Sequence, residues 1–186
     1  MTNVINEFLQ ESIEIRQRML ADEALLSAIT DCGNEILKRT SQGGCVYICG
    51  NGGSACDAAH FAEELVARYK RERQGIKAMH FGDPGVLTCW SNDYDYQSTF
   101  KRQAETFCSD KDVLVGISTS GNSGNVLQAI EAAKSKGSFT IGLLGKDGGK
   151  IKDACDSALI VPSSETDRIQ EVHITIIHTF CEMLEV

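Results

Sequence analysis

Two histidines, a glutamate and a glutamine stand in two helix-forming stretches that are otherwise rich in apolar residues. His60 and Glu64 are four residues apart, so on a helix they project from one face and can converge on one ion or ligand atom. Gln170 and His178 would occupy adjoining parts of one surface of a C-terminal helix. This spacing is compatible with a four-ligand metal site, in which zinc suits histidine and carboxylate and glutamine is a less usual ligand. A His–Glu pair on a helix surface is the ordinary alternative.

Two loops rich in glycine and serine follow predicted strands. The first, Gly50–Ala55, reads GNGGSA and matches the G-x-G-x-x-A pattern of dinucleotide-binding turns, although a plain tight turn would also use glycine. The second, Ser118–Ser123, reads STSGNS and places four hydroxyls in six residues at the start of a predicted helix. Hydroxyl donors, free amides and the positive end of a helix suit a terminal phosphate. Together the loops predict a ligand with a phosphate at one end and polar oxygens along its length.

The C-terminal stretch from about Glu165 is apolar on almost every side. A helix of this kind must be buried on several sides, which predicts contacts with a sheet and with another copy of the chain. Polar groups are costly there unless they are satisfied or functional. We therefore expect His173 to be a core or interface histidine with a local hydrogen bond. The β-branched run at residues 174–177 favours a strand as the alternative to a helix.

A repeating pattern of strands and helices must position these side chains. Short apolar runs predict five strands at residues 45–49, 78–81, 113–117, 140–144 and 158–161. Helical patterns lie between them, one of them starting at Ser54 with Asp57 as a variant capping box and another at Ser123. The alternation predicts an α/β fold, a single doubly wound, flavodoxin-like, five-stranded parallel sheet covered on both faces. Such sheets bind ligands beyond the carboxyl ends of their strands, which is where both loops lie.

The chain is long enough for one domain with a substantial core. Its 186 residues predict a single domain, 1–186, in which a helical pair forms an N-terminal extension over 1–42. The sheet core and a buried C-terminal helix would then occupy 43–186. Residues such as Ile5, Phe8 and Leu9 recur at helical spacing in the first of the two helices.

Composition excludes several functional classes. A net charge of −8 disfavours a general affinity for nucleic acid or for anionic membranes, and a basic cluster at residues 68–73 is interpreted as a solvated helix end. No apolar run reaches the roughly 18 residues of a membrane span, and Met1–Val4 does not resemble the start of a signal peptide. Eight cysteines occur without a C-x-x-C pair, as expected for reduced thiols. These observations predict a cytoplasmic protein.

Several motifs, in order along most of the chain, resemble the sugar isomerase (SIS) domain of bacterial phosphoheptose isomerases. The resemblance extends from about residue 45 to the end and involves CGNGGS at 49–54, HFAEEL at 60–65, NDY at 92–94, GISTSGNS at 116–123, GKDGG at 145–149, and DRIQE at 167–171 through His178. It implies an SIS-type fold and a homotetramer with active sites at subunit interfaces. It also implies interconversion of sedoheptulose 7-phosphate and D-glycero-D-manno-heptose 7-phosphate, toward heptose for surface polysaccharide such as lipopolysaccharide or capsule.

The resemblance further implies a role for individual residues. Glu64 and His178 would be the acid–base pair for proton transfer through an enediol, and one zinc ion per subunit would be held by His60, Glu64, Gln170 and His178. Substrate contacts would come from both loops, both helices and the NDY motif: Asn51, Gly52, Gly53, Ser54, Glu64, Asn92, Asp93, Ser118, Thr119, Ser120, Ser123 and Gln170. Zinc would stabilise the developing enediolate. Firm ligation would lower the basicity of Glu64, so its two implied roles compete.

Three alternatives remain from the sequence. A nucleotide-linked dehydrogenase would use the first loop, with Asp83 as its ribose ligand, but it would normally need a further substrate domain. A non-catalytic SIS protein that binds the replication initiator is a second alternative, although such a relative lacks the acidic and imidazole side chains found here at Glu64 and His178. An isomerase of another phosphosugar is the third. Ala55 and Ser91, where some family members carry histidine and glycine, border the predicted pocket.

Overall fold

The computed structural model describes residues 2–185, in which thirteen helices and strands alternate in the predicted manner. They are α1 (Thr2–Ala21), α2 (Glu23–Ser41), β1 (Val46–Gly50), α3 (Gly53–Val66), β2 (Ala78–His80), α4 (Pro84–Asp93), α5 (Thr99–Phe107), β3 (Val113–Ser118), α6 (Gly124–Ser135), β4 (Phe139–Leu144), α7 (Ile151–Ala154), β5 (Ser157–Ile160) and α8 (Thr166–Met183). None of the described helices is long and apolar enough to cross a membrane.

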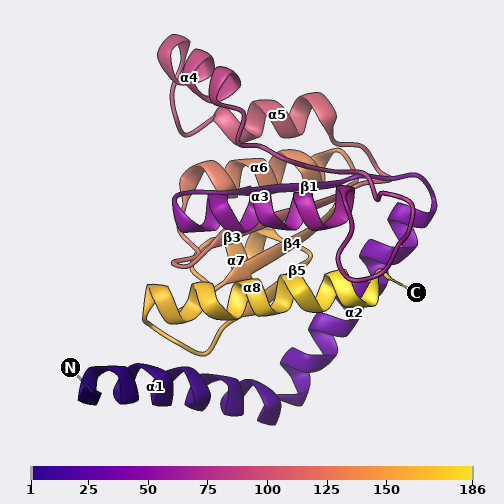
Figure 1. Cartoon of the computed structure of the whole chain (residues 1–186). Helices are drawn as coiled ribbons and strands as arrows, with labels where there is room; N and C mark the ends of the chain where they lie inside the picture. The colour runs from indigo at the N-terminus through magenta and orange to yellow at the C-terminus, as the bar shows by residue number, and fades with distance from the viewer. Residues whose placement is uncertain (1, 186) are drawn as a thin grey trace.

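The five strands form one parallel sheet in the order β2-β1-β3-β4-β5 (Figure 1). The predicted α/β fold is confirmed, including its doubly wound, flavodoxin-like strand order. The order reverses direction between β1 and β3, where the chain first adds β2 on one side and then β3, β4 and β5 on the other. The loops after β1 and β3 therefore lie at the switch point, the place where such sheets bind ligands.

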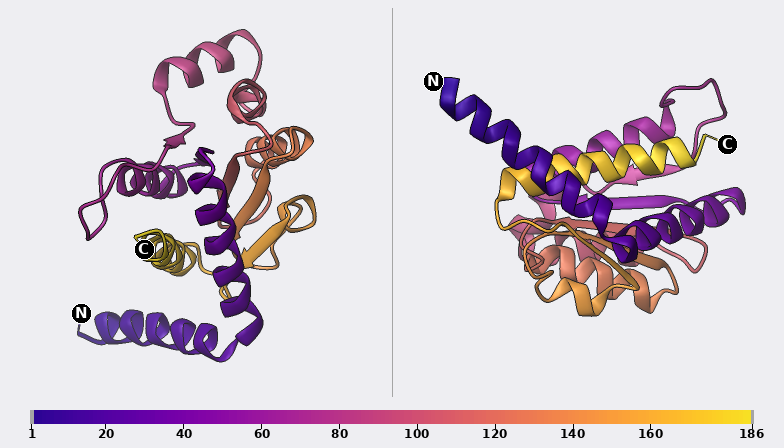
Figure 2. Two further views of the ribbon diagram at one scale, coloured as in Figure 1. Left: turned by 90° about the vertical axis from the view of Figure 1, so that its right-hand side faces the viewer. Right: turned by 90° about the horizontal axis from the view of Figure 1, so that it is seen from below.

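Helices cover both faces of the sheet, and each face has its own core. On one face α2, α3 and α8 pack with part of α1, and on the other α5, α6 and α7 do so (Figures 1 and 2). Alternating side chains of β3 supply the two cores, since Val113, Val115 and Ile117 face the first and Leu114 faces the second. Because the strand is buried on both faces, its sequence is apolar throughout rather than alternating.

Two local predictions are wrong for identifiable reasons. Helix α3 begins at Gly53 and its cap is Gly52, whose φ of 57° glycine adopts without strain. Ser54 is buried within the first turn and makes no capping hydrogen bond, so the predicted capping box with Asp57 does not form. The strand alternative for residues 174–177 is also wrong, because this run lies inside α8. Burial on several sides outweighs the β propensity of its isoleucines.

Helices α1 and α8 differ in how far the chain buries their apolar side chains. The chain itself buries most of the apolar side chains of α8, including Ile169, Ile177 and Phe180. The apolar character of α8 therefore does not by itself require a second subunit. Helix α1 lies on the outer side of α8, away from the sheet (Figures 1 and 2). It leaves six large apolar side chains exposed: Val4, Ile5, Phe8, Leu9, Ile13 and Leu20.

Candidate active site

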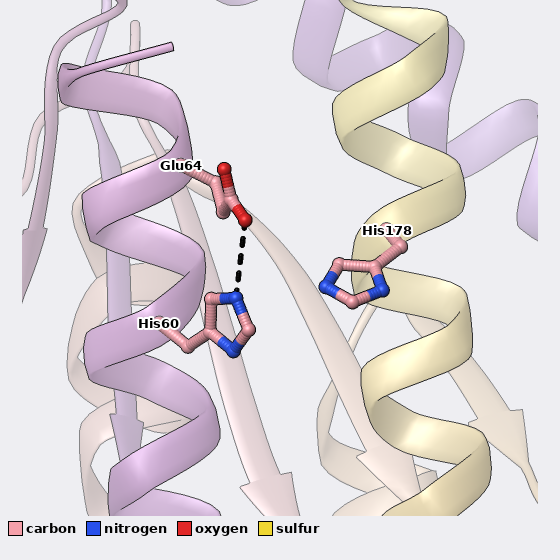
Figure 3. A group of neighbouring side chains, drawn as sticks. All are labelled: His60, Glu64 and His178. Atoms are coloured by element: carbon pink, nitrogen blue, oxygen red, sulfur yellow. Dashed lines mark hydrogen bonds and ion pairs between the residues drawn. The ribbon is translucent and has the colours of Figure 1, made fainter. Parts of the chain in front are cut away.

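Helices α3 and α8 lie side by side and bring three predicted site residues together. His60 Nε2 lies 3.1 Å from Glu64 Oε1 on α3, and the imidazole of His178 faces both from α8 (Figure 3). One ligand atom from each of the three residues lies within 4.8 Å of the other two. The two imidazole centroids are 5.2 Å apart with their planes at 74°. The predicted convergence of the α3 pair with His178 is therefore present in a single chain.

This three-residue cluster is shielded unevenly. The Glu64 side chain is 15% exposed and that of His60 is 41% exposed, so the carboxylate lies deeper than the imidazole beside it. The ring of Tyr69 stacks on the other side of the cluster, 5.5 Å from the His178 centroid at 29°. A mostly buried carboxylate beside two imidazoles can hold a cation, or can pass a proton to or from a ligand placed against it.

The donor set of the cluster fits a metal ion. Two imidazole nitrogens and one carboxylate oxygen converge, which is a ligand combination that catalytic zinc sites use while keeping a position open for another group.

Gln170 lies away from this cluster. Two turns of α8 separate Gln170 from His178, a rise of about 12 Å. The Gln170 amide lies at the start of α3 instead, where a Cβ added to Gly53 would stand 2.4 Å from its nitrogen. Glycine at position 53 thus leaves room for this amide beside the first loop.

The loop after β1 is held by an amide pair. Asn51 and Asn125 exchange two hydrogen bonds of 2.8 Å between their side chains, and the Tyr96 hydroxyl donates to Asn51 Oδ1 at 2.6 Å. Asn125 belongs to the first turn of α6 and is 2% exposed. The pair therefore ties the first loop to the helix that follows the second. A cavity of about 420 Å³ opens beside this loop between α3, β2 and the segment around Tyr96.

The serine loop after β3, Ser118–Ser123, is shaped by hydrogen bonds of its own hydroxyls and by contact with the loop that follows β4. Ser118 Oγ and Ser123 Oγ are 2.9 Å apart, and the Asn122 N–H donates to Ser120 Oγ at 3.2 Å. Gly121 has a φ of 65°, and a Cβ there would stand 2.0 Å from the carbonyl oxygen of Gly148. The glycine loop after β4 thus presses directly on the serine loop. Hydroxyls and the free amides at the start of α6 lie in one turn, a combination of donors that suits a phosphate.

Asn92 and Asp93 lie apart from the rest of the predicted site. They end helix α4, which contains no buried residue and stands off the body of the molecule (Figures 1 and 2). Both side chains are exposed, and Asn92 Nδ2 donates to Asp93 Oδ1 at 2.9 Å. Within residues 2–185, no hydrogen bond joins either side chain to the two loops. Their predicted substrate contact stays a prediction.

Comparison with known proteins identifies the family of the chain. Residues 7–145 match the family model of the SIS domain. The chain is 47% identical over 184 residues to the phosphoheptose isomerase of Vibrio cholerae. The aligned residues cover 98% of this chain and 96% of that protein. It is 48% identical over 180 residues to the phosphoheptose isomerase of Helicobacter pylori, covering 96% and 89%. The chain belongs to the phosphoheptose isomerase family.

A solved structure supports the same assignment. The phosphoheptose isomerase of Neisseria gonorrhoeae superposes with a TM-score of 0.93 at 36% identity, over 99% of this chain and 98% of that one. The SIS match ends at residue 145, before α8 begins, whereas the match to the Vibrio cholerae phosphoheptose isomerase extends over nearly the whole chain. His178 therefore lies in the part that the general SIS match leaves out.

The phosphoheptose isomerase fold also shows what His173 and Asp83 do. His173 is fully buried on α8, and its Nε2 lies 3.1 Å from the carbonyl oxygen of Leu144, to which it donates. Burial lowers the pKa of His173 to about 4, because a charged imidazole would lose its hydration there. Its prediction as a core histidine is confirmed. Asp83, the ribose ligand of the dehydrogenase alternative, caps α4 by accepting the Val86 N–H at 2.8 Å.

Sequence reasoning missed three residues that complete the site of this phosphoheptose isomerase relative. Asn125 and Tyr96 hold Asn51, and Tyr69 stacks on His178. Asn125 could have been suspected, since a buried asparagine in the first turn of a helix needs a partner. Tyr96 and Tyr69 lie in connecting segments, where no periodic pattern indicates which way a ring points.

Proposed function

We propose that the chain interconverts sedoheptulose 7-phosphate and D-glycero-D-manno-heptose 7-phosphate as an aldose–ketose isomerase. The observation that carries the proposal is the position of Glu64 and His178, which meet beside His60 between α3 and α8. A base and an acid on opposite sides of a small space are what an enediol reaction needs. The names of the full-length relatives support the choice of substrate.

The two loops would seat the sugar phosphate. The serine loop would take the phosphate through hydroxyls and the amides at the start of α6. The first loop and Gln170 would then contact the sugar oxygens along the chain. Asn92 and Asp93 would contribute from α4, a helix without buried residues. The full proposed set of substrate contacts is Asn51, Gly52, Gly53, Ser54, Glu64, Asn92, Asp93, Ser118, Thr119, Ser120, Ser123 and Gln170.

The chemistry would consist of proton transfers by two side chains. Glu64 takes the proton from the carbon next to the carbonyl, and His178 donates a proton to the carbonyl oxygen, which gives an enediol. His178 then recovers a proton from the neighbouring hydroxyl, and Glu64 returns its proton to the other carbon. Protons balance over the cycle, and the ketose has become an aldose. His60 would hold Glu64 through the hydrogen bond seen between them.

We further propose that one zinc ion per subunit is held by His60, Glu64, Gln170 and His178. The convergence of two imidazoles and a carboxylate supports His60, Glu64 and His178 as ligands. The Gln170 amide lies beside Gly53 in this structure, so it would have to turn toward the cluster to complete the set. When bound, the ion would supply positive charge to stabilise the oxygen anion that develops during enediol formation.

A homotetramer with active sites at subunit interfaces is the proposed assembly of this 1–186 SIS domain, whose N-terminal extension is 1–42. The exposed apolar face of α1 supports it, since Ile5 and Leu9 are 59% and 57% exposed. Sedimentation of the purified protein should show a tetramer, and an Ile5→Glu, Leu9→Glu double variant should dissociate. A fully active monomer would contradict interface sites.

We place the reaction in the cytoplasm, without nucleic acid or membrane partners, where it would supply heptose for lipopolysaccharide or capsule. All eight cysteines are free, which suits a reducing compartment. The negative net charge supports the absence of nucleic acid.

A panel of phosphosugars, assayed with and without added zinc, tests the proposed function. Sedoheptulose 7-phosphate should be converted fastest, and chelation followed by zinc addition should remove and restore the activity. Preference for a pentose or hexose phosphate would reassign the substrate while keeping the chemistry. Absence of turnover on every sugar, with the fold intact, would favour the non-catalytic alternative.

A further inference from the structure

A buried carboxylate near the C-terminus organises the segment that follows α3. The Glu185 side chain is fully buried and accepts three consecutive backbone N–H groups, from Tyr69 at 3.1 Å, Lys70 at 3.0 Å and Arg71 at 2.9 Å. A charged acceptor that satisfies several backbone donors makes strong hydrogen bonds and fixes the direction of the backbone. Glu185 therefore determines the path of residues 69–71, which carry no helix or strand of their own.

The side chain of Arg73, just beyond this segment, attaches it to α3. Arg73 Nη2 donates to the carbonyl oxygen of Glu64 at 2.8 Å, and Arg73 Nη1 donates to that of Leu65 at 2.9 Å. Arg73 Nε also lies 3.7 Å from Glu185 Oε1. The segment thus connects the end of α3, which carries His60 and Glu64, to the end of α8, which carries His178.

The side chain that this arrangement delivers to the site is the ring of Tyr69. It stacks on the His178 imidazole with centroids 5.5 Å apart and packs against the core on the same face of the sheet. His60 meets His178 edge-on from the other helix. The imidazole of His178 is therefore held between two rings, and its orientation toward Glu64 depends on where Tyr69 stands.

We propose that Glu185 and Tyr69 are positioning residues for the isomerase reaction: Glu185 fixes the 69–71 backbone, and Tyr69 thereby holds the His178 imidazole in its orientation toward Glu64. Both are assigned to act through His178 and not on the reacting atoms themselves. The inference rests on the proposed function, since it takes His178 as the acid. Partners that orient a functional histidine typically contribute about 10- to 100-fold to activity or metal affinity.

Four variants separate positioning from general stability. Tyr69→Leu should lower kcat by about 10-fold or more with KM changed by less than about threefold, because the acid is misplaced while the phosphate seat is intact. Tyr69→Phe keeps the ring and should retain activity. Glu185→Gln should lower kcat by several-fold. Glu182→Gln is the matched control, since Glu182 pairs with Lys70 and Arg71 on the same segment but is 43% exposed, and it should leave kcat unchanged.

A double variant tests whether Glu185 acts through Tyr69. If it does, Glu185→Gln should lower kcat little further once Tyr69→Leu is present. An equal loss of kcat in both backgrounds would overturn this route. Wild-type kcat in Tyr69→Leu, or a Glu185→Gln variant that is merely less thermostable, would overturn the positioning role altogether.

A second measurement needs neither substrate nor metal. In metal-free protein labelled at histidine, stacking on Tyr69 should displace the His178 ring-proton resonances, which are assigned by their loss in His178→Gln. Tyr69→Leu should abolish the displacement, Glu185→Gln should reduce it, and Glu182→Gln should leave it unchanged. Unchanged resonances in Tyr69→Leu would overturn the inference even in an active enzyme. Inactivity on every sugar, with the resonances behaving as expected, would instead count against the proposed function alone.

Discussion

The two halves of the site are built in different ways. The helical half, with His60, Glu64 and His178, stands on α3 and α8, which both pack into the larger of the two cores. The loop half, with the turns after β1 and β3, depends on glycine conformations and on hydroxyls that hydrogen-bond to one another. Rigid helices suit groups that must meet reacting atoms, and adaptable turns suit many modest contacts to a phosphate. We therefore expect the helical half to determine kcat and the loop half to determine KM.

Glu64→Gln should produce the largest effect. It keeps the shape of the side chain and removes the base, so kcat should fall by roughly 10²–10⁴ while the fold persists. The decisive measurement is exchange of solvent deuterium into the reacting carbon of the substrate. Wild type should incorporate the label and Glu64→Gln should not. Exchange at the wild-type rate would show that another group is the base, and would remove the expected difference between the two halves.

His178→Gln should cause a comparable loss of kcat by removing the acid. Combined with Glu64→Gln, it should cost less than the sum of the two separate free energies, because groups that act as a unit are not additive. The four kcat values of the double-mutant cycle check this. Additive losses would mean that the two side chains act in separate steps.

The stability of the helical half should depend on pH through His173, which lies on α8 and faces the core rather than the site. Its pKa of about 4 in the folded chain lies below the ordinary value of 6.5, so the unfolded chain binds this proton more tightly. Stability should be complete above about pH 6.5 and should decline as pH falls toward 4, by about 2 kcal/mol between pH 7.5 and 5.

His173→Gln is the matched variant, because its amide can still donate to the Leu144 carbonyl and does not titrate. Urea unfolding at fixed protein concentration should show a smaller loss of stability at pH 5 than in wild type. The same pH dependence in both proteins would assign it to other groups.

The difference between the halves also explains what the sequence could predict. Periodicity identified the strands and the loops that follow them. The strand order that makes the loops after β1 and β3 a switch point came from the structure. Helical spacing alone brings His60 and Glu64 together. That His178 meets them depends on α3 and α8 lying side by side, which local patterns do not contain. Loop backbones and their distant partners determine where two ring side chains lie: Glu185 holds the backbone at Tyr69, and Asn51 accepts from the Tyr96 hydroxyl. The start of α3 likewise depends on the backbone conformation of the loop before it. The position of α4, with few packing contacts, is likewise not encoded in periodicity.

The smallest effect is expected in the serine loop. Ser120→Ala with Ser123→Ala removes two neutral hydroxyls from the proposed phosphate seat, and at about 1 kcal/mol each the loss of binding should be about 2 kcal/mol at most. Part of this is offset, because Ser123 also bonds to Ser118 and Ser120 also accepts from Asn122, so the free loop loses partners too. KM should rise while kcat changes little, since the acid and base are untouched. Ser135→Ala, at the far end of α6 where the hydroxyl donates to the Ala132 carbonyl at 2.7 Å, is the matched control and should change neither. An unchanged KM in the double variant would remove this loop from the site, and a fall in kcat alone would mean that the loop takes part in the chemistry that we assign to the helices.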